Sequence, residues 1–207
     1  MSTDSDPPQT NRSPVLNLPN QLTSLRLLLS IVLFGMIAWE FYLASMILFI
    51  VAASTDWLDG YFARKYGQVT TLGRILDPLA DKVIVCGTFV FLVAVPEMGT
   101  VPMGLRAWMV VVIVGRELLV TALRSFIEER GSDFSAKLSG KLKMVFQCIA
   151  AGTALFYLTY PSPAAGVSPD VPWWCWGLLV VSTWTAVVLT VYSGIGYVIA
   201  AVRLVRQ

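Results

Sequence analysis

Long apolar segments recur along the chain and are separated by short polar or basic connections. Six of them approach or exceed the ~20 residues that a helix needs to cross the hydrocarbon core of a bilayer. They run over residues 22–39, 42–62, 75–95, 105–127, 142–160 and 173–202. The pattern predicts an all-α integral membrane protein with six transmembrane helices.

The residues before the first apolar segment predict two further features. Residues 1–15 are rich in Ser, Asp and Pro, which is typical of a disordered tail and leaves 16–207 as one membrane domain. Pro19 suits the first turn of a helix, whose apolar stripe consists of Leu18, Leu22 and Leu25. We therefore expect a short amphipathic helix along the membrane interface ahead of the first span.

Composition and charge support a membrane location and set the orientation. Hydrophobic residues make up 56% of the 207-residue chain, and its mean hydropathy is +0.69, which is too apolar for a typical soluble domain. Lys and Arg occur in connections 65–74 and 130–137 but not in 96–104 or 161–172, and Arg106 is the main exception. The positive-inside rule predicts a multi-pass membrane protein with both termini in the cytosol. We expect it in the cytoplasmic (inner) membrane, with no nucleic acid partner.

Four aspartates interrupt the second and third apolar segments near their predicted cytosolic ends. These are Asp56, Asp59, Asp77 and Asp81. An ionisable side chain inside a span costs about 2.5–3.5 kcal/mol or more at the membrane centre. Four of them at helical spacing therefore indicate a bound cation or a reaction.

Helical geometry places these aspartates on faces that also carry small residues. At about 100° per residue, Asp59 lies about 60° from Asp56. Gly60 and Ala63 lie on the same side of that helix, and the stripe on the next helix consists of Gly73, Asp77 and Asp81. Small neighbours leave room for a ligand, and carboxylate oxygens are the donors that Mg²⁺ or Mn²⁺ prefers. Two such ions about 3.5–4 Å apart can clamp a phosphate under attack.

One segment resembles the signature of the CDP-alcohol phosphatidyltransferase family at all of its fixed positions, and reads Asp56-x-x-Asp59-Gly60-x-x-Ala63-Arg64-x8-Gly73-x-x-x-Asp77-x-x-x-Asp81. The resemblance implies a homodimeric six-helix membrane enzyme in which an alcohol displaces CMP from a CDP-linked lipid. It implies two metal ions held by Asp56, Asp59, Asp77 and Asp81, with Asp81 also the general base. The implied CDP-binding residues are Gly60, Ala63, Arg64 and Gly73. Asn20 and Thr23 join them from a segment similar to the amino terminus of bacterial members, for which a plain helix start is the alternative interpretation.

Basic residues outside this motif indicate which alcohol attacks. Arg116, Glu117 and Arg124 occupy a sector about 100° wide on the fourth apolar segment, and Lys141 and Lys143 begin the fifth. Arg contacts phosphate in a bidentate manner, and Lys adds a point charge. We therefore expect Arg116, Arg124, Lys141 and Lys143 to bind the phosphate of a phosphorylated alcohol such as glycerol-3-phosphate, with Glu117 orienting an Arg.

The same cations also resemble those of family members that act on glycerol-3-phosphate. The similar segments are Gly115-Arg116-Glu117-x6-Arg124 and Gly140-Lys141-x-Lys143-x-x-x-Gln147. The reaction so implied converts CDP-diacylglycerol and glycerol-3-phosphate to phosphatidylglycerophosphate and CMP. Simple positive-inside anchoring is the better interpretation of Arg130, Lys137, Arg203 and Arg206.

Two classes of alternative remain at this point. Within the enzyme class, the acceptor could instead be phosphatidylglycerol, inositol phosphate or serine. Outside it, a carboxylate cluster in a membrane could carry a divalent cation, although transporter sites usually lie near the midplane on broken helices. The chain contains no histidine, which excludes the phospholipase D-like mechanism because that mechanism needs a His nucleophile.

Overall fold

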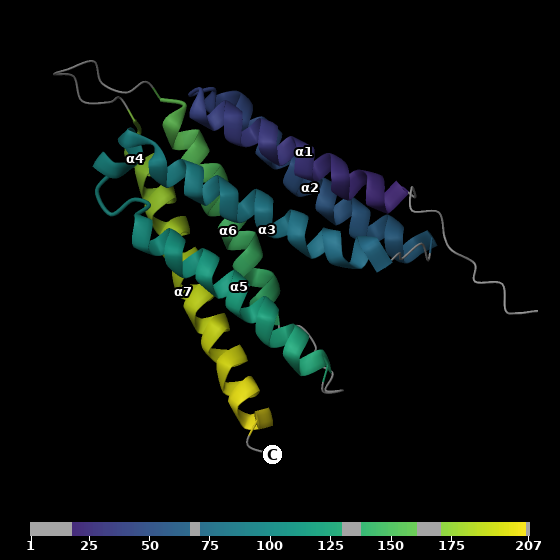
Figure 1. The fold of residues 1–207 in the computed structure, drawn as a ribbon. Coiled ribbons are helices and arrows are strands. Elements are labelled where there is room, and N and C mark those ends of the chain that lie inside the picture. Colours follow the sequence, from purple (N-terminus) through teal and green to yellow (C-terminus); the bar gives the residue numbers. More distant parts are fainter. Residues whose placement is uncertain (1–17, 67–70, 130–137, 161–170, 206–207) are drawn as a thin grey trace, which may run out of the picture.

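The computed structural model of the protein describes residues 18–66, 71–129, 138–160 and 171–205. The helices in these ranges are α1 (Leu18–Ala38), α2 (Tyr42–Tyr66), α3 (Thr71–Ala94), α4 (Pro96–Thr100), α5 (Ala107–Glu129), α6 (Leu138–Leu158) and α7 (Trp173–Val205) (Figure 1). A long helix lies over each predicted apolar segment, so the prediction of an all-α fold is confirmed for the described ranges. The predicted tail, residues 1–15, lies outside them.

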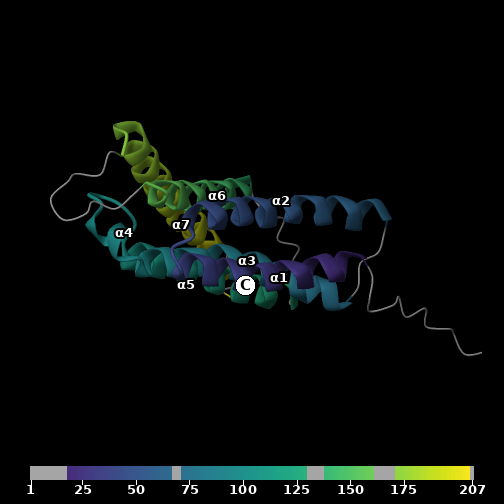
Figure 2. The same ribbon diagram turned by 90° about the horizontal axis from the view of Figure 1, so that it is seen from above.

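The long helices form a closed series of neighbours. The pairs in contact are α1 and α2, α2 and α6, α6 and α7, α7 and α5, α5 and α3, and α3 and α1. Helix α3 also contacts α6. Figure 1 shows α1, α2 and α3 running side by side as one group, and the view from above in Figure 2 places α2 and α6 over α1, α3 and α5. Helix α3 belongs to this group and also contacts α5 and α6. Residues on α3 can therefore form a site together with residues of α5 and α6.

Helices α1 and α3 pack closely around Gly87. The Phe34 ring of α1 stacks on Phe91 of α3, with ring centroids 4.9 Å apart. A Cβ atom on Gly87 would overlap the Phe34 ring. The lack of a side chain at Gly87 therefore permits this approach, and the surrounding buried core includes Leu33, Ile37, Ile84, Phe89 and Leu92.

The prediction of a separate interfacial helix before the first span is wrong for the described residues. Helix α1 runs without a break from Leu18 to Ala38, because no Gly or Pro between Pro19 and Phe34 interrupts its propagation. Thr23 and Arg26, near its start, are only 1% and 2% exposed. One face of α1 is therefore packed inside the protein near its start, while Leu25 on another face is 47% exposed.

The connection predicted over residues 96–104 contains the short helix α4. Pro96 lies at its start, where the missing N–H of proline costs no hydrogen bond. The Arg106 guanidinium then donates hydrogen bonds to the carbonyl oxygens of Gly99 and Val101. This use of Arg106 inside its own loop accounts for a cation beside a connection that otherwise lacks Lys and Arg.

The outer surface carries many large apolar side chains. Ile31, Val111 and Val181 are 66%, 70% and 66% exposed, and exposed apolar patches of this kind mark contact with a membrane or another protein. Within the described ranges, only α7 is long and apolar enough by itself to cross a bilayer, over Trp173–Arg203. Shorter apolar stretches occupy Thr23–Ala38, Tyr42–Thr55 and Leu142–Leu158. Six transmembrane helices therefore stay a prediction.

Candidate active site

The aspartate motif lies on the end of α2 and the start of α3. Asp56 and Asp59 belong to α2, Asp77 and Asp81 belong to α3, and the two helices are in contact. The backbone therefore brings the two acidic segments of the motif to neighbouring helices. Asp81 is described in full, whereas other predicted site side chains lie outside the described residues: Asn20, Asp56, Asp59, Gly60, Ala63, Arg64, Gly73, Asp77 and Lys141.

Asp81 forms an ion pair with Arg26 of α1. The guanidinium Nη1 of Arg26 donates a hydrogen bond to Asp81 Oδ1 at 3.1 Å. The Arg26 side chain is 2% exposed, and that of Asp81 is 26% exposed. The backbone carbonyl of Arg26 accepts a hydrogen bond from Ser30 Oγ at 2.8 Å. The predicted general base is therefore held by a charged contact between two helices and still reaches the solvent-accessible side of α3.

A cavity of about 200 Å³ lies beside Asp81, between α3, α5 and α6. Its lining consists of Asp81, Lys82, Val85, Cys86, Glu117, Arg124, Lys143, Met144 and Gln147. Three of these side chains are cations and two are carboxylates, so the cavity wall is basic on balance. A predicted general base and two predicted phosphate-binding residues, Arg124 and Lys143, therefore share one cavity.

Glu117 lies between two of the predicted cations. Its Oε1 accepts a hydrogen bond from Arg116 Nη1 at 3.0 Å and a second one from Lys143 Nζ. Lys143 is 6% exposed, and the Glu117 side chain is 12% exposed. The expectation that Glu117 orients an Arg is consistent with these contacts, which extend to a Lys on a second helix, α6.

Arg116 faces α7 and is absent from the cavity lining. Its Nη2 donates a hydrogen bond to Ser193 Oγ at 2.6 Å, and its guanidinium carbon lies 5.6 Å from the centre of the Tyr197 ring. A Cβ atom on Gly194 would come within 3.1 Å of Arg116 Cγ. These contacts favour an indirect role for Arg116 in place of direct contact with an acceptor.

Sequence reasoning assigned no role to three polar residues in or beside the cavity. Arg26 pairs with Asp81, Lys82 lines the cavity, and Gln147 lines it while its Nε2 donates to Thr190 Oγ1 at 3.0 Å. Arg26 carried a usable signal, because an arginine inside an apolar helix needs a partner. Its partner lies 55 residues away, and helical periodicity does not predict such a contact.

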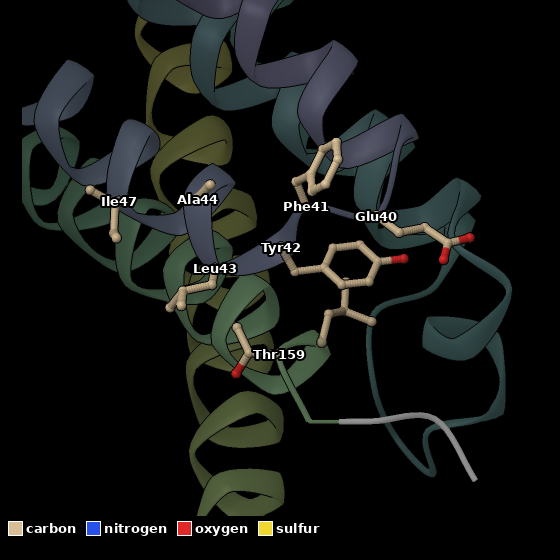
Figure 3. Close-up of a pocket in the computed structure, with 8 residues that line it drawn as sticks. Glu40, Phe41, Tyr42, Leu43, Ala44, Ile47 and Thr159 are labelled. Atoms are coloured by element: carbon tan, nitrogen blue, oxygen red, sulfur yellow. The ribbon is translucent and has the colours of Figure 1, made fainter. Parts of the chain in front are cut away.

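A second and more open pocket, of about 460 Å³, has different chemistry. It is lined by Glu40, Phe41, Tyr42, Leu43, Ala44, Ile47, Leu158 and Thr159 at the start of α2 and the end of α6 (Figure 3). Glu40 is the only charged residue in this lining, so the pocket does not suit a phosphate. With a rise of 1.5 Å per residue, α2 separates Tyr42 from Asp59 by about 25 Å, which places this pocket far from the aspartate motif.

Comparison with known proteins identifies the family. The profile of the CDP-alcohol phosphatidyltransferase family matches residues 16–192. The chain is 38% identical to the CDP-diacylglycerol--glycerol-3-phosphate 3-phosphatidyltransferase of Bacillus subtilis, over 69% of this chain and 78% of that protein. It is 33% identical to a probable phosphatidylglycerophosphate synthase of Mycobacterium tuberculosis, over 93% of this chain and 85% of that protein. The chain therefore belongs to the CDP-alcohol phosphatidyltransferase family, as its motif predicted.

A solved structure shares the fold. The crystal structure of Mycobacterium tuberculosis phosphatidylinositol phosphate synthase with CDP-DAG bound aligns with a TM-score of 0.62 at 19% identity. The alignment covers 90% of this chain and 87% of that chain. A second structure of that synthase, in complex with manganese and citrate, aligns with a TM-score of 0.59. The helical arrangement described above is thus the arrangement of a known phosphatidyltransferase.

Proposed function

We propose that this protein transfers the phosphatidyl group of CDP-diacylglycerol to glycerol-3-phosphate and releases phosphatidylglycerophosphate and CMP. The observation that carries the proposal is the cavity in which Asp81 shares a wall with Arg124 and Lys143. A general base and cations for a second anion are both required when the attacking alcohol carries a phosphate. Relatives named for this same reaction support the choice of acceptor, and transport of a cation is not favoured.

The reaction is a direct displacement at phosphorus. A hydroxyl oxygen of glycerol-3-phosphate forms a bond to the lipid-side phosphorus of CDP-diacylglycerol, and the bond between that phosphorus and the CMP oxygen breaks. CMP leaves with the electron pair, and Asp81 takes the hydroxyl proton. Arg26 holds the Asp81 carboxylate during this step through the 3.1 Å contact.

The donor set of the motif fits a hard divalent cation. Carboxylate oxygens are ligands that Mg²⁺ and Mn²⁺ accept, and Asp81 presents its carboxylate at the cavity wall. Asp56, Asp59, Asp77 and Asp81 would hold two ions, and the ions would neutralise charge on the pyrophosphate. Gly60, Ala63, Arg64, Gly73, Asn20 and Thr23 would bind the cytidine diphosphate, as the family resemblance implies.

The acceptor phosphate binds to the basic wall of the cavity. Arg124 and Lys143 line the cavity and contact the phosphate directly. Lys141 lies two residues before Lys143 on α6 and adds to the positive charge, while Arg116 acts through its hydrogen bond to Glu117.

The six long helices cross the cytoplasmic (inner) membrane with both termini in the cytosol, and the protein is a homodimer.

The test is a radiolabel assay in mixed micelles with CDP-diacylglycerol as the donor. Glycerol-3-phosphate, phosphatidylglycerol, inositol phosphate and serine are supplied separately, with Mn²⁺ or Mg²⁺. Of the four acceptors, only glycerol-3-phosphate is expected to give product. Chelation of the metal should abolish turnover. Higher kcat/KM with any other acceptor would overturn the assignment.

A further inference from the structure

Glu117 and Asp81 are the two carboxylates of the cavity lining, and Glu117 is the one that is not the predicted general base. It lines the same cavity as Arg124 and Lys143. A carboxylate beside a bound phosphate is unfavourable, because like charges in a partly desolvated site repel. Its presence therefore needs a role other than contact with the phosphate.

The contacts of Glu117 supply that role. A single oxygen, Oε1, accepts hydrogen bonds from Arg116 and from Lys143. Lys143 is 6% exposed, and a buried ammonium group without a carboxylate partner is strongly destabilised. Glu117 therefore keeps a charged Lys143 at the cavity wall. The ammonium group has three N–H donors, so it can keep its bond to Glu117 and still donate to a phosphate.

Glu117 is itself fixed from the opposite side. Arg116 donates one hydrogen bond to Glu117 and another to Ser193 of α7, and its guanidinium lies over the Tyr197 ring. Ser193 is 3% exposed, so this anchor is shielded from water. A continuous series of polar contacts thus runs from Ser193 through Arg116 and Glu117 to Lys143.

We infer that Glu117 is a positioning residue for the acceptor site, held by Arg116 and Ser193, and that it sets the affinity for glycerol-3-phosphate by fixing Lys143. The inference rests on the proposed function. It assigns Arg116 an indirect part in acceptor binding, and it makes α7 a contributor to a site that α7 does not line.

The experiment is a double-mutant cycle with Glu117→Gln and Lys143→Met, read as the KM for glycerol-3-phosphate, the KM for CDP-diacylglycerol and kcat. Gln keeps the size of Glu and removes its charge. Glu117→Gln should raise the acceptor KM about tenfold, the loss expected for a charge-assisted contact, and leave the donor KM within about twofold. In the Lys143→Met background the same change should have almost no further effect. Glu40→Gln is the matched control, because Glu40 is exposed and lies outside this cavity.

Three results would overturn the inference. They are an unchanged acceptor KM in Glu117→Gln, an equal rise of the acceptor KM in the wild-type and Lys143→Met backgrounds, and a rise of the acceptor and donor KM values together. If Glu117→Gln does not fold, Ser193→Ala takes its place. Loss of this one hydrogen bond should raise the acceptor KM about threefold and leave the donor KM unchanged. An unchanged acceptor KM would refute the anchoring role of Ser193. Failure of the wild-type protein to use glycerol-3-phosphate would instead refute the proposed function.

Discussion

The ion pair between Arg26 and Asp81 should contribute measurable stability as well as orient a base. Its Nη1 to Oδ1 distance is 3.1 Å, with Arg26 2% and Asp81 26% exposed. A hydrogen bond between charged groups contributes about 1.5–3 kcal/mol, and partial exposure of Asp81 favours the lower half of that range. We therefore expect a coupling free energy of about 2 kcal/mol between the two side chains. For a chain of about 200 residues this corresponds to about 4–8 °C in Tm.

The measurement is a double-mutant cycle on the purified protein in detergent, with Arg26→Met, Asp81→Asn and the double variant followed by thermal unfolding. Met retains the apolar length of the Arg side chain, and Asn retains the shape of Asp. The double variant should unfold about 4–8 °C above the value predicted by adding the two single shifts. Arg203→Met, which removes an exposed arginine from the last turn of α7, is the control. Strictly additive shifts would show that this contact does not stabilise the packing of α1 against α3.

Three further outcomes are expected. Gly87→Ala should destabilise the protein by about 1–3 kcal/mol because its methyl group would overlap Phe34. Gly152→Ala should not, because an added Cβ there would meet no neighbouring atom within 4 Å. Equal Tm values for the two variants would contradict the close packing of α1 and α3. Asp77→Ala should lower kcat about a hundredfold or more and weaken Mn²⁺ binding measured by calorimetry, and a near wild-type rate at saturating metal would refute metal assistance. Ala63→Leu should raise the KM for CDP-diacylglycerol without changing that for glycerol-3-phosphate, and unchanged kinetics would place the nucleotide elsewhere.

The helices could be predicted from the sequence because each is a long apolar run between polar connections. The start of the first long helix was predicted less well, because a local stripe of leucines does not reveal whether a helix stops. Helix α1 begins at Leu18 and continues to Ala38 without a break. The short helix α4 was also missed, because five residues carry too little periodicity. These errors concern ends and connections, where local patterns contain least information.

The site shows the same division between local and long-range information. The spacing of the aspartates identified the family, and helical geometry predicted that Arg116 and Arg124 share one side of a helix. It did not reveal which neighbours that side meets. Arg116 meets Ser193 of α7, while Arg124 lines the cavity with Asp81. Both contacts depend on how helices distant in sequence pack together.

Helix α7 supplies hydroxyl groups to buried side chains on helices that precede it in the chain. Thr190 accepts a hydrogen bond from Gln147 of α6, and Ser193, one turn later, accepts one from Arg116 of α5. During synthesis, α5 and α6 therefore leave the ribosome before these partners exist. A nascent chain that ends before residue 190 leaves Arg116 and Gln147 without these two hydrogen bonds, and insertion of the last helix is the step that completes them.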